Sequence, residues 1–296
     1  MPASFRANLD KFQQQNIGTT TTTTTTTNIQ LWSNTDVLHL LEKFYDVDIQ
    51  NVYKHDASPI QKADLARYAI LGVHGGWYLD LDVGLHCGKG ATKLSACRND
   101  LHSLELFLQA KRRAKAGTGA GDGDGEGGTL FWERGVLSAA EMKQSARHPC
   151  RNHVPEYATR LSNYALHASS NEGRLFFRDV LSLAACRVSV NIIDGCGNDD
   201  DEYQVLFTTG PDVVTEMAYG NRNVETASLG GSGVGGNGGV CQTAARSKAG
   251  RRMRTAQERG MLVIDPKSMV MNANTFSWRN GRGEKMKNRA MVRGAS

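Results

Sequence analysis

The chain has no hydrophobic run long enough to cross a membrane. A membrane-spanning helix needs roughly 18 or more consecutive apolar residues, and the 296-residue sequence contains no such stretch. Its first residues also lack the apolar centre and small-residue cleavage site of a signal peptide. Within these residues we therefore expect neither a transmembrane anchor nor a cleaved secretory leader.

Cysteine pairs with the spacing of a zinc site are also missing. Structural zinc sites commonly use two cysteines separated by two residues, and the sequence contains no C-x-x-C pair. The even number of cysteines permits disulfides in a secretory lumen but does not identify the pairs. The six are Cys87, Cys97, Cys150, Cys186, Cys196 and Cys241.

The excess of positive charge is small. The formal net charge is +5 at pH 7, and much of it lies in a basic tail at residues 279–296. A basic tail can bind nucleic acid, but no aromatic residue follows Trp278, which favours a solvated tail. We therefore expect no nucleic-acid partner. The hydrophobic fraction of 40% is sufficient for a packed core, which argues against wholesale disorder.

Low-complexity stretches interrupt the chain at about residues 18–27, 116–128 and 221–250. They are a threonine run, an alternation of glycine with acidic residues, and a glycine-rich stretch that becomes basic. Asp122, Asp124 and Glu126 are regularly spaced, but they lack the order of a calcium-binding loop, so a linker is favoured. We predict one domain over residues 1–278, with these three stretches as disordered inserts.

Residues 64–83, which read DLARYAILGVHGGWYLDLDV, carry the most information about function. The pattern predicts a helix, a break at Gly75 and Gly76, and a short apolar strand that finishes in Asp80 and Asp82. Alternate strand side chains share a face, so the two carboxylates should lie side by side. Such a pair is tolerated when water or a hard divalent cation lies between its members. The local chemistry therefore suggests a metal–diphosphate site.

The helix before this strand contributes a second charged pair, Asp64 and Arg67. Their spacing of three residues places them on one helical face, where a surface ion pair of little energetic value is the alternative interpretation. The helix also carries a set of mostly small apolar residues that we expect to pack closely against the sheet. They are Ala63, Ala66, Ala69, Ile70 and Val73.

The whole string resembles the DXD sugar-binding region of glycosyltransferase family 32. That family includes fungal initiating mannosyltransferases, glycosphingolipid galactosyltransferases and bacterial capsule enzymes. Further segments also resemble the family. Before the core string, residues 29–32 resemble its strand and residues 33–45 its helix, with Ser33 and Asp36 as a capping box. After the core string, the resemblance continues in a strand end at residues 131–133, a segment at 160–164 before a helix at 173–183, the Thr209-Gly210-Pro211 turn, and Phe276-Ser277-Trp278.

The resemblance implies an α/β fold of the GT-A type, with a mixed central sheet flanked by helices. It implies a metal-dependent glycosyltransferase that moves a hexose from a UDP- or GDP-sugar to a hydroxyl of a glycan or glycolipid, with retention of configuration. Ligands in such sheets bind at the carboxyl ends of strands, where we expect Asp80 and Asp82. Eukaryotic members are commonly Golgi membrane proteins facing the lumen, so an anchor would lie upstream of this chain.

The resemblance also assigns roles to residues. Mn²⁺ or Mg²⁺ would bridge Asp82 and the donor diphosphate, with Asp80 contacting ribose or metal-bound water. Asp64 and Arg67 would bind the donor sugar, with Asn163 contributing. Arg67 and the two DXD aspartates form the expected catalytic set. The resemblance places Ser277 and Trp278 on a mobile loop that closes over the diphosphate, where the indole N–H can donate to phosphate oxygen.

The sequence departs from the family pattern in two further places. Family members open with a strand of the type Ile-Pro-Lys-x-Ile-His-Gln, whereas this chain begins Met1-Pro2-Ala3-Ser4-Phe5; we expect a truncated chain with weakened nucleotide binding. Members often place a metal-serving histidine five or six residues before the Ser-Trp tryptophan. Here Asn272 and Ala273 hold those positions, and Asn272 offers a neutral amide oxygen, a weaker ligand.

Two other functions remain open at this stage. A hydrophobic strand followed by D-x-D-V also resembles the first motif of haloacid-dehalogenase-type Mg-dependent phosphatases, and residues 192–201 imitate a later acidic motif of that family. Against it, that family places its aspartate strand near the start of the domain and needs no D-x-x-R helix. A catalytically inactive truncated homologue is the other alternative, because the first strand is missing.

Overall fold

The computed structural model describes two groups of residues that are compact in themselves. The described residues are Asp10, 29–80, 83–85, 101–116, 127–132, 161–190, 205–206, 208–219, 254–264 and 270–272. The chain divides into one unit drawn from residues 1–27, 80–106 and 267–296, and a second from residues 28–79 and 107–266. Each unit is taken below by itself.

The second unit begins with helices that are defined by their N-caps. Helix α2 spans Asn34–Phe44, and the predicted capping box between Ser33 and Asp36 is present. Helix α3 spans Val47–Asn51 and continues into a π-helical turn, η1, at Val52–Asp56. Residues 29–33 form no strand, so the strand expected at 29–32 is wrong.

Helix α4, Pro59–His74, is the predicted helix of the DXD string. Ser58 caps it in a capping box with Gln61, and Pro59 occupies a first-turn position where its missing N–H costs nothing. The helix ends at Gly75, whose φ is +68° and whose N–H donates to the carbonyl of Leu71. Glycine adopts positive φ without steric cost, so this break confirms the prediction.

A four-stranded sheet follows, in the order β1-β4-β3-β5. Strand β1 is Gly76–Leu79, β3 is Gly128–Trp132, β4 is Leu161–Ala168 and β5 is Met261–Ile264. Strand β4 pairs antiparallel with both β1 and β3, while β3 and β5 are parallel. The predicted α/β class with a mixed sheet is therefore confirmed.

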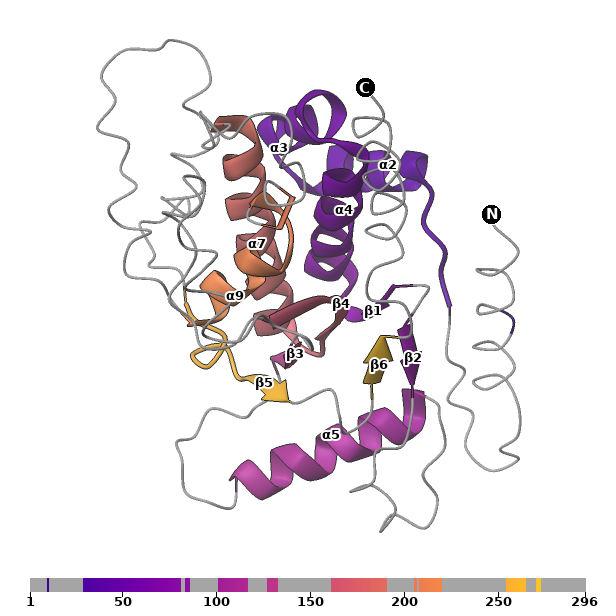
Figure 1. Ribbon diagram of the computed structural model, residues 1–296, viewed down its shortest axis with the longest axis vertical. Helices are drawn as coiled ribbons and strands as arrows, with labels where there is room; N and C mark the ends of the chain where they lie inside the picture. Colours follow the sequence, from indigo (N-terminus) through magenta and orange to yellow (C-terminus); the bar gives the residue numbers. More distant parts are fainter. Residues whose placement is uncertain are drawn as a thin grey trace, which may run out of the picture. The chain divides into compact units, whose positions relative to one another are not determined.

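The main core lies between this sheet and the helices. Helix α7, Asn171–Val190, runs beside α4 (Figure 1), and α9, Pro211–Tyr219, follows the Thr209-Gly210-Pro211 turn. Burying a large apolar side chain contributes about 1.5–3 kcal/mol, and the core draws such residues from every layer. They include Leu41, Tyr68, Leu71, Leu130, Leu166, Phe176, Phe177, Val180 and Val213.

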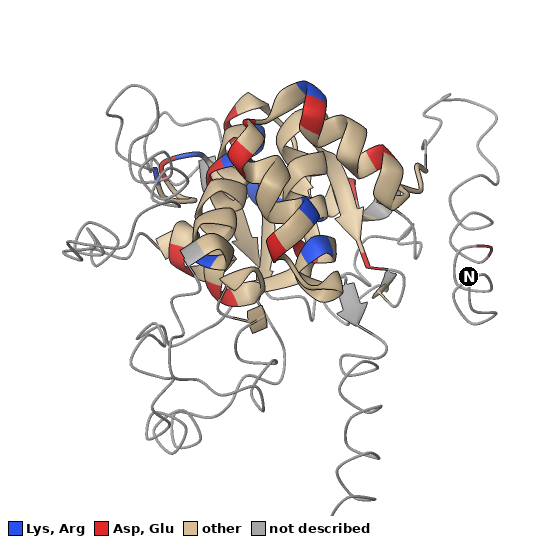
Figure 2. Cartoon of the chain, turned by 90° about the horizontal axis from the view of Figure 1, so that it is seen from above, with Lys and Arg blue, Asp and Glu red and all other residues tan. Residues whose placement is uncertain are grey.

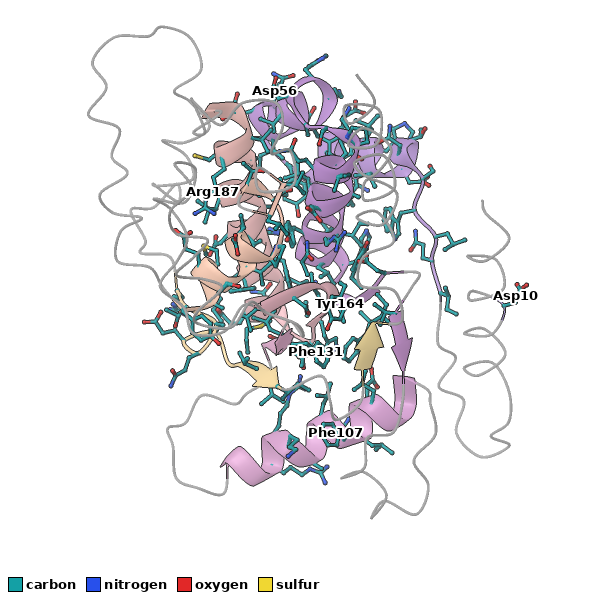
Figure 3. The ribbon with its side chains drawn as sticks, viewed as in Figure 1. Asp10, Asp56, Phe107, Phe131, Tyr164 and Arg187 are labelled. Carbon is teal, nitrogen blue, oxygen red and sulfur yellow. The ribbon has the colours of Figure 1, made fainter. Side chains whose placement is uncertain are left out.

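Ion pairs tie the edges of this core together. Arg187 of α7, labelled in Figure 3, pairs with Glu216 of α9, and both side chains are buried. Arg259, which precedes β5, bonds Glu172 and Asp179 of α7. Buried charges are tolerated only when they are paired, so these bonds fix α7 against its neighbours. On the helices seen in Figure 2, residues of both charge signs are interspersed.

Helix α5, Leu101–Ala116, is shared between the two units. Within the second unit, Arg112 donates to the hydroxyl of Thr129 on β3 at 3.3 Å. Thr129 and Leu130 are neighbours on a strand, so they point to opposite faces, and Leu130 belongs to the main core. Helix α5 therefore contacts the sheet face opposite the main core.

Helix α5 and strand β3 extend into both ends of the predicted insert at 116–128. Ala116 is the last residue of α5 and Gly128 the first residue of β3. Gly127 is buried, and its N–H donates to Gly260. The inserts at 18–27 and 221–250 and the basic tail lie outside the described residues.

Two further findings concern the hydropathy of the helices and the state of Cys186. Across the described ranges, no helix combines the length and hydropathy required to span a bilayer. Cys186, near the C-terminal end of α7, is disulfide-bonded, which agrees with the sequence-based expectation that disulfides are permitted.

Candidate functional site

The predicted pair Asp64 and Arg67 is buried inside the helical layer. Arg67 Nη2 lies 3.1 Å from Asp64 Oδ1, and the two side chains are only 8% and 5% exposed. The surface ion-pair interpretation is therefore wrong. Taking two charges out of water is costly, so they need excellent geometry and further hydrogen bonds.

Asn163 of β4 supplies some of those bonds. Its amide Nδ2 donates to Asp64 Oδ1 at 2.9 Å, and its main-chain oxygen accepts from Arg67 Nη1 at 2.5 Å. The three residues that the resemblance assigns to the donor sugar thus lie in direct contact.

The segment just before α9 completes the cluster. Thr209 Oγ1 donates to Asp64 Oδ2 at 2.8 Å, and the Tyr68 hydroxyl donates to the main-chain oxygen of Thr209 at 2.7 Å. Gln61 Nε2 donates to Thr208 Oγ1 at 2.9 Å. Gln61, Asp64 and Tyr68 are spaced i, i+3 and i+7, so they form one polar stripe along α4 that binds residues 208–210.

Electrostatics keep the Tyr68 hydroxyl a donor. Burial, and then the neighbouring Asp64 carboxylate, raise the pKa of Tyr68 well above its ordinary value. A phenol in that state stays protonated throughout the physiological range. The Tyr68 hydroxyl therefore remains able to donate to Thr209 at physiological pH.

Tyr78 joins the cluster to β1. The guanidinium of Arg67 lies over the Tyr78 ring, with Cζ 4.8 Å from the ring centroid. Such a cation–π contact contributes about 0.5–2 kcal/mol. Tyr78 is two residues before Asp80 in the chain.

Asp80 lies just beyond the strand that was expected to contain it. Strand β1 ends at Leu79 and strand β2, Val83–Leu85, begins three residues after Asp80. The N–H of Val83 donates to the carbonyl of Asp80 at 2.9 Å. Asp82 lies outside the described residues, so the expected shared face of Asp80 and Asp82 stays a prediction.

The first unit brings a second predicted residue close to this point. Strand β6, Val270–Asn272, pairs antiparallel with β2, and Asn272 is directly opposite Val83. The backbone of Asn272 thus lies beside Val83, the residue that follows Asp82 in the chain, although 189 positions separate Asn272 from Val83. Ser277 and Trp278 lie outside the described residues.

The chemistry of these residues fits a hard divalent cation. Mg²⁺ and Mn²⁺ are held by one or two carboxylates, carbonyl oxygens and water, and the DXD aspartates with Asn272 offer such oxygens. Within the described residues, which exclude Asp82, no three His, Cys, Asp or Glu side chains form a metal-binding group.

Sequence reasoning missed several members of the cluster. Of the small apolar set expected to pack inside, Ala69 is in the core and Ala66, Ile70 and Val73 pack against it, whereas Ala63 is exposed. The buried residues of α4 also include Gln61, Asp64 and Tyr68. Their spacing was a signal, but polar residues at core spacing are usually read as a solvated face.

Comparisons with known proteins agree with this geometry over part of the chain. Residues 5–91 match the family described as "Glycosyltransferase sugar-binding region containing DXD motif". One curated relative is the uncharacterized glycosyltransferase L373 of Acanthamoeba polyphaga mimivirus, which is 39% identical over 54 residues. That match covers 18% of this chain and 22% of the viral protein, so it spans about a fifth of each. No solved structure matches the chain significantly.

The resemblance predicted from the DXD string is confirmed by these matches. The matched region contains α4, β1, Asp80 and the described part of the DXD segment. Asn163 and Thr209 lie outside it, and the structure alone connects them to Asp64.

Proposed function

We propose that this chain is a metal-dependent glycosyltransferase that moves a hexose from a UDP- or GDP-sugar to a hydroxyl of a glycan or glycolipid. One observation carries the proposal. The helix that leads through Gly75 and Gly76 to Asp80 holds a carboxylate and a guanidinium, Asp64 and Arg67, in a buried and fixed arrangement. In this proposal the DXD segment would hold the cation and the donor diphosphate, and the pair of Asp64 and Arg67 would bind the donor sugar.

The donor sugar is bound by Asp64 and Arg67 in this proposal, with Asn163 assisting. A carboxylate accepts from sugar hydroxyls, while a guanidinium donates to hydroxyl or phosphate oxygens. The hydrogen bonds to Asn163 and Thr209 hold both groups before the donor arrives. Such preorganisation reduces the ordering cost of binding. Because both side chains are nearly buried, the sugar meets only their exposed edges.

Asp80, Asp82 and Asn272 would hold Mn²⁺ or Mg²⁺. A cation bound there supplies Lewis-acid stabilisation of the departing nucleoside diphosphate, worth several kcal/mol. Ser277 and Trp278 would close over the diphosphate, where the indole N–H is a suitable donor to phosphate oxygen.

The transfer retains the configuration of the anomeric carbon in this proposal. Retention by two displacements needs a free carboxylate as the covalent nucleophile. In the sugar cluster the carboxylate is Asp64, and it accepts hydrogen bonds from Arg67, Asn163 and Thr209. A carboxylate held in this way is a poor nucleophile, which favours a same-face internal-return mechanism.

The full chain should be assayed for transfer and for donor hydrolysis with UDP- and GDP-hexoses, with Mn²⁺ and after complete chelation with EDTA. We expect nucleoside diphosphate release that depends on the cation and falls at least about tenfold in Asp80→Asn and Asp82→Asn. Activity that survives chelation would overturn the metal role. Turnover of a phosphomonoester without donor cleavage would favour the phosphatase, and binding without turnover an inactive homologue.

A luminal setting in the secretory pathway belongs to the same proposal. Cys186 is disulfide-bonded, and disulfides persist in oxidising compartments. Peptide mapping of the chain expressed through the secretory pathway, with and without reduction, should release the Cys186 peptide only after reduction. Recovery of that peptide as a free thiol without reduction would remove this support.

A further inference from the structure

Strand β4 carries a bulge at residues Ser162–Tyr164. Its antiparallel register with β3 shifts between two pairs, Leu130 with Leu166 and Trp132 with Leu161. Between these pairs β4 has four residues and β3 has one, so β4 holds three extra residues. The pairing of β4 with β1 also ends before this stretch. Bulges of this kind bend a strand and re-aim its side chains, and they are frequent next to active sites.

Because the number of extra residues is odd, the bulge reverses which side chains of β4 face the helices. Alternate residues of a regular strand share a face, and Leu166 and Ala168 lie in the main core. By that alternation, the side chain of Asn163 would point to the opposite face of the sheet. Instead, Leu161 lies in the main core and Asn163 reaches Asp64 on α4. The bulge therefore brings Asn163 to the helical layer.

Leu161 anchors the bulge at its N-terminal end. It is completely buried, it is paired with Trp132 of β3, and its N–H donates to Thr215 Oγ1 of α9 at 2.8 Å. Thr215 is held in turn, since its hydroxyl donates to the carbonyl of Pro211 at 2.7 Å. The strand is therefore fixed at a point two residues before Asn163, on the face that Asn163 shares.

Asn163 is the residue that this bulge exposes. The structure describes all eight residues of β4, and the other seven are buried. We propose that the bulge is a specificity-determining element: counted from Leu161, it selects Asn163 as the side chain of β4 that meets the donor sugar. This inference rests on the proposed function, because it takes Asn163 to contact the sugar. A strand that turned Asn163 to the other face would remove its amide from the sugar and from Asp64.

The test inserts one glycine on either side of Asn163 in the full chain. In the first variant the glycine stands between Ser162 and Asn163, which puts Asn163 out of phase with Leu161. In the matched control it stands between Asn163 and Tyr164, which preserves that phase. The two variants have the same length and composition and differ only in the order of two residues. Asn163→Ala serves as the reference for a missing amide. Affinities are measured by calorimetry with Mn²⁺ for UDP-glucose, GDP-mannose, UDP and GDP.

With the glycine before Asn163, we expect the affinity for the preferred nucleotide sugar to fall about tenfold, equivalent to ~1.4 kcal/mol, as in Asn163→Ala. With the glycine after Asn163, this affinity should stay within about threefold of wild type. The affinity for the bare nucleoside diphosphate should change less than about twofold in every variant. The first variant should also melt about 2–4 °C below the second, because the Asp64 carboxylate loses the hydrogen bond from Asn163.

The possible failures are distinguishable. If wild type binds nucleotide sugar and the two insertions weaken that binding equally, the role of the bulge is wrong while the proposed function stands. If the glycine after Asn163 is the more harmful, the direction of Asn163 is not set from Leu161, and the proposal is overturned. If wild type binds no nucleotide sugar, the proposed function fails and the specificity role falls with it. Equal melting temperatures of the two insertion variants would then also overturn the bulge geometry.

A substitution replaces the insertions if neither variant folds. Thr215→Val removes the acceptor of the Leu161 N–H and so loosens the anchored end of the bulge. It should lower the affinity for nucleotide sugar by about threefold or more, with less than about a twofold change for the bare nucleoside diphosphate. Wild-type affinity for nucleotide sugar in Thr215→Val would overturn the role of Leu161 as the anchor.

Discussion

The indole of Trp77 on β1 is stacked on the imidazole of His167 on β4. The ring centroids are 4.2 Å apart and the planes differ by 5°, and the two residues are directly opposite in the antiparallel register. Nδ1 of His167 is buried without a hydrogen-bond partner in the described part of the chain. Protonation would place an unpaired N–H there, so the neutral ring belongs to the native state.

This stack predicts a loss of stability in mild acid. Burial, with a smaller contribution from Arg112, lowers the pKa of His167 from 6.5 to about 3. Between these pH values His167 is protonated in the unfolded chain but neutral in the folded chain. The contribution of His167 is therefore fully present above pH 6.5 and is lost as the pH falls toward 3, by up to ~1.4 kcal/mol per pH unit.

Urea unfolding at pH 7, 6, 5 and 4 should show this. His167→Phe keeps a ring against Trp77 but cannot titrate, so its stability should fall less steeply with acid than that of wild type. His55→Gln, an exposed histidine, controls for the loss of one titratable group. Parallel curves for wild type and His167→Phe would contradict the prediction.

Removing Arg67 should cost far more than removing an exposed partner. Arg67→Met leaves the Asp64 carboxylate buried and uncompensated, with an expected loss of about 3–5 kcal/mol in the free energy of unfolding. Lys54→Met breaks the Lys54–Glu42 pair, whose side chains are 33% and 49% exposed, and should cost about 0–1 kcal/mol. Denaturant titration measures the unfolding free energy of both variants. Similar losses for Arg67→Met and Lys54→Met would mean that solvent reaches Asp64.

Gly72→Ala should destabilise the chain although alanine favours helices by about 1 kcal/mol. A Cβ at this position would lie 2.6 Å from the Tyr45 hydroxyl and 2.9 Å from Arg178 Cγ, so we expect a net loss of about 1–3 kcal/mol. Tyr45→Phe removes the nearer atom and also the bond from Tyr45 to Ala69. In a double-mutant cycle, the losses in unfolding free energy of Gly72→Ala and Tyr45→Phe should sum to more than the loss of the double variant. Strict additivity would show that the Tyr45 hydroxyl does not cause the steric clash.

Asn272→Asp should strengthen cation binding. It replaces a neutral amide oxygen with a charged one on the strand that pairs with β2, so we expect the Mn²⁺ affinity to rise about tenfold, or ~1.4 kcal/mol. Met271→Asp adds the same charge one residue earlier in the chain and should not reproduce the gain. Calorimetric titration of Mn²⁺ in the presence of a nucleoside diphosphate measures both. Equal gains would show a general charge effect rather than ligation.

Local sequence determined the helix and strand elements around the DXD string. The capping boxes at Ser33 and Ser58, the glycine break at Gly75 and the turn at Thr209-Gly210 each depend on residues within a few positions. Short-range hydrogen bonds and allowed φ angles set such features. For that reason α2, α4 and the strand start could be predicted, as could the family resemblance that the string carries.

The boundary of β1 was less predictable. Residues 79–83 alternate in polarity as a strand would, yet β1 ends at Leu79. Its register with β4 ends at Leu79 and Ala165, although β4 itself continues to Leu161. A pattern of alternating residues carries no information about where the pairing of two strands ends.

Sequence alone thus determined which residues are chemically able to bind a cation and a sugar, and the short elements that carry them. Only the tertiary structure decided that Asp64 is bound by Asn163 and Thr209, which lie 99 and 145 positions away, and that the polar stripe of α4 faces inward while Ala63 faces solvent. These contacts exist because β4 and the segment just before α9 lie against α4. The free energy of a buried charge depends on the partners that packing brings to it.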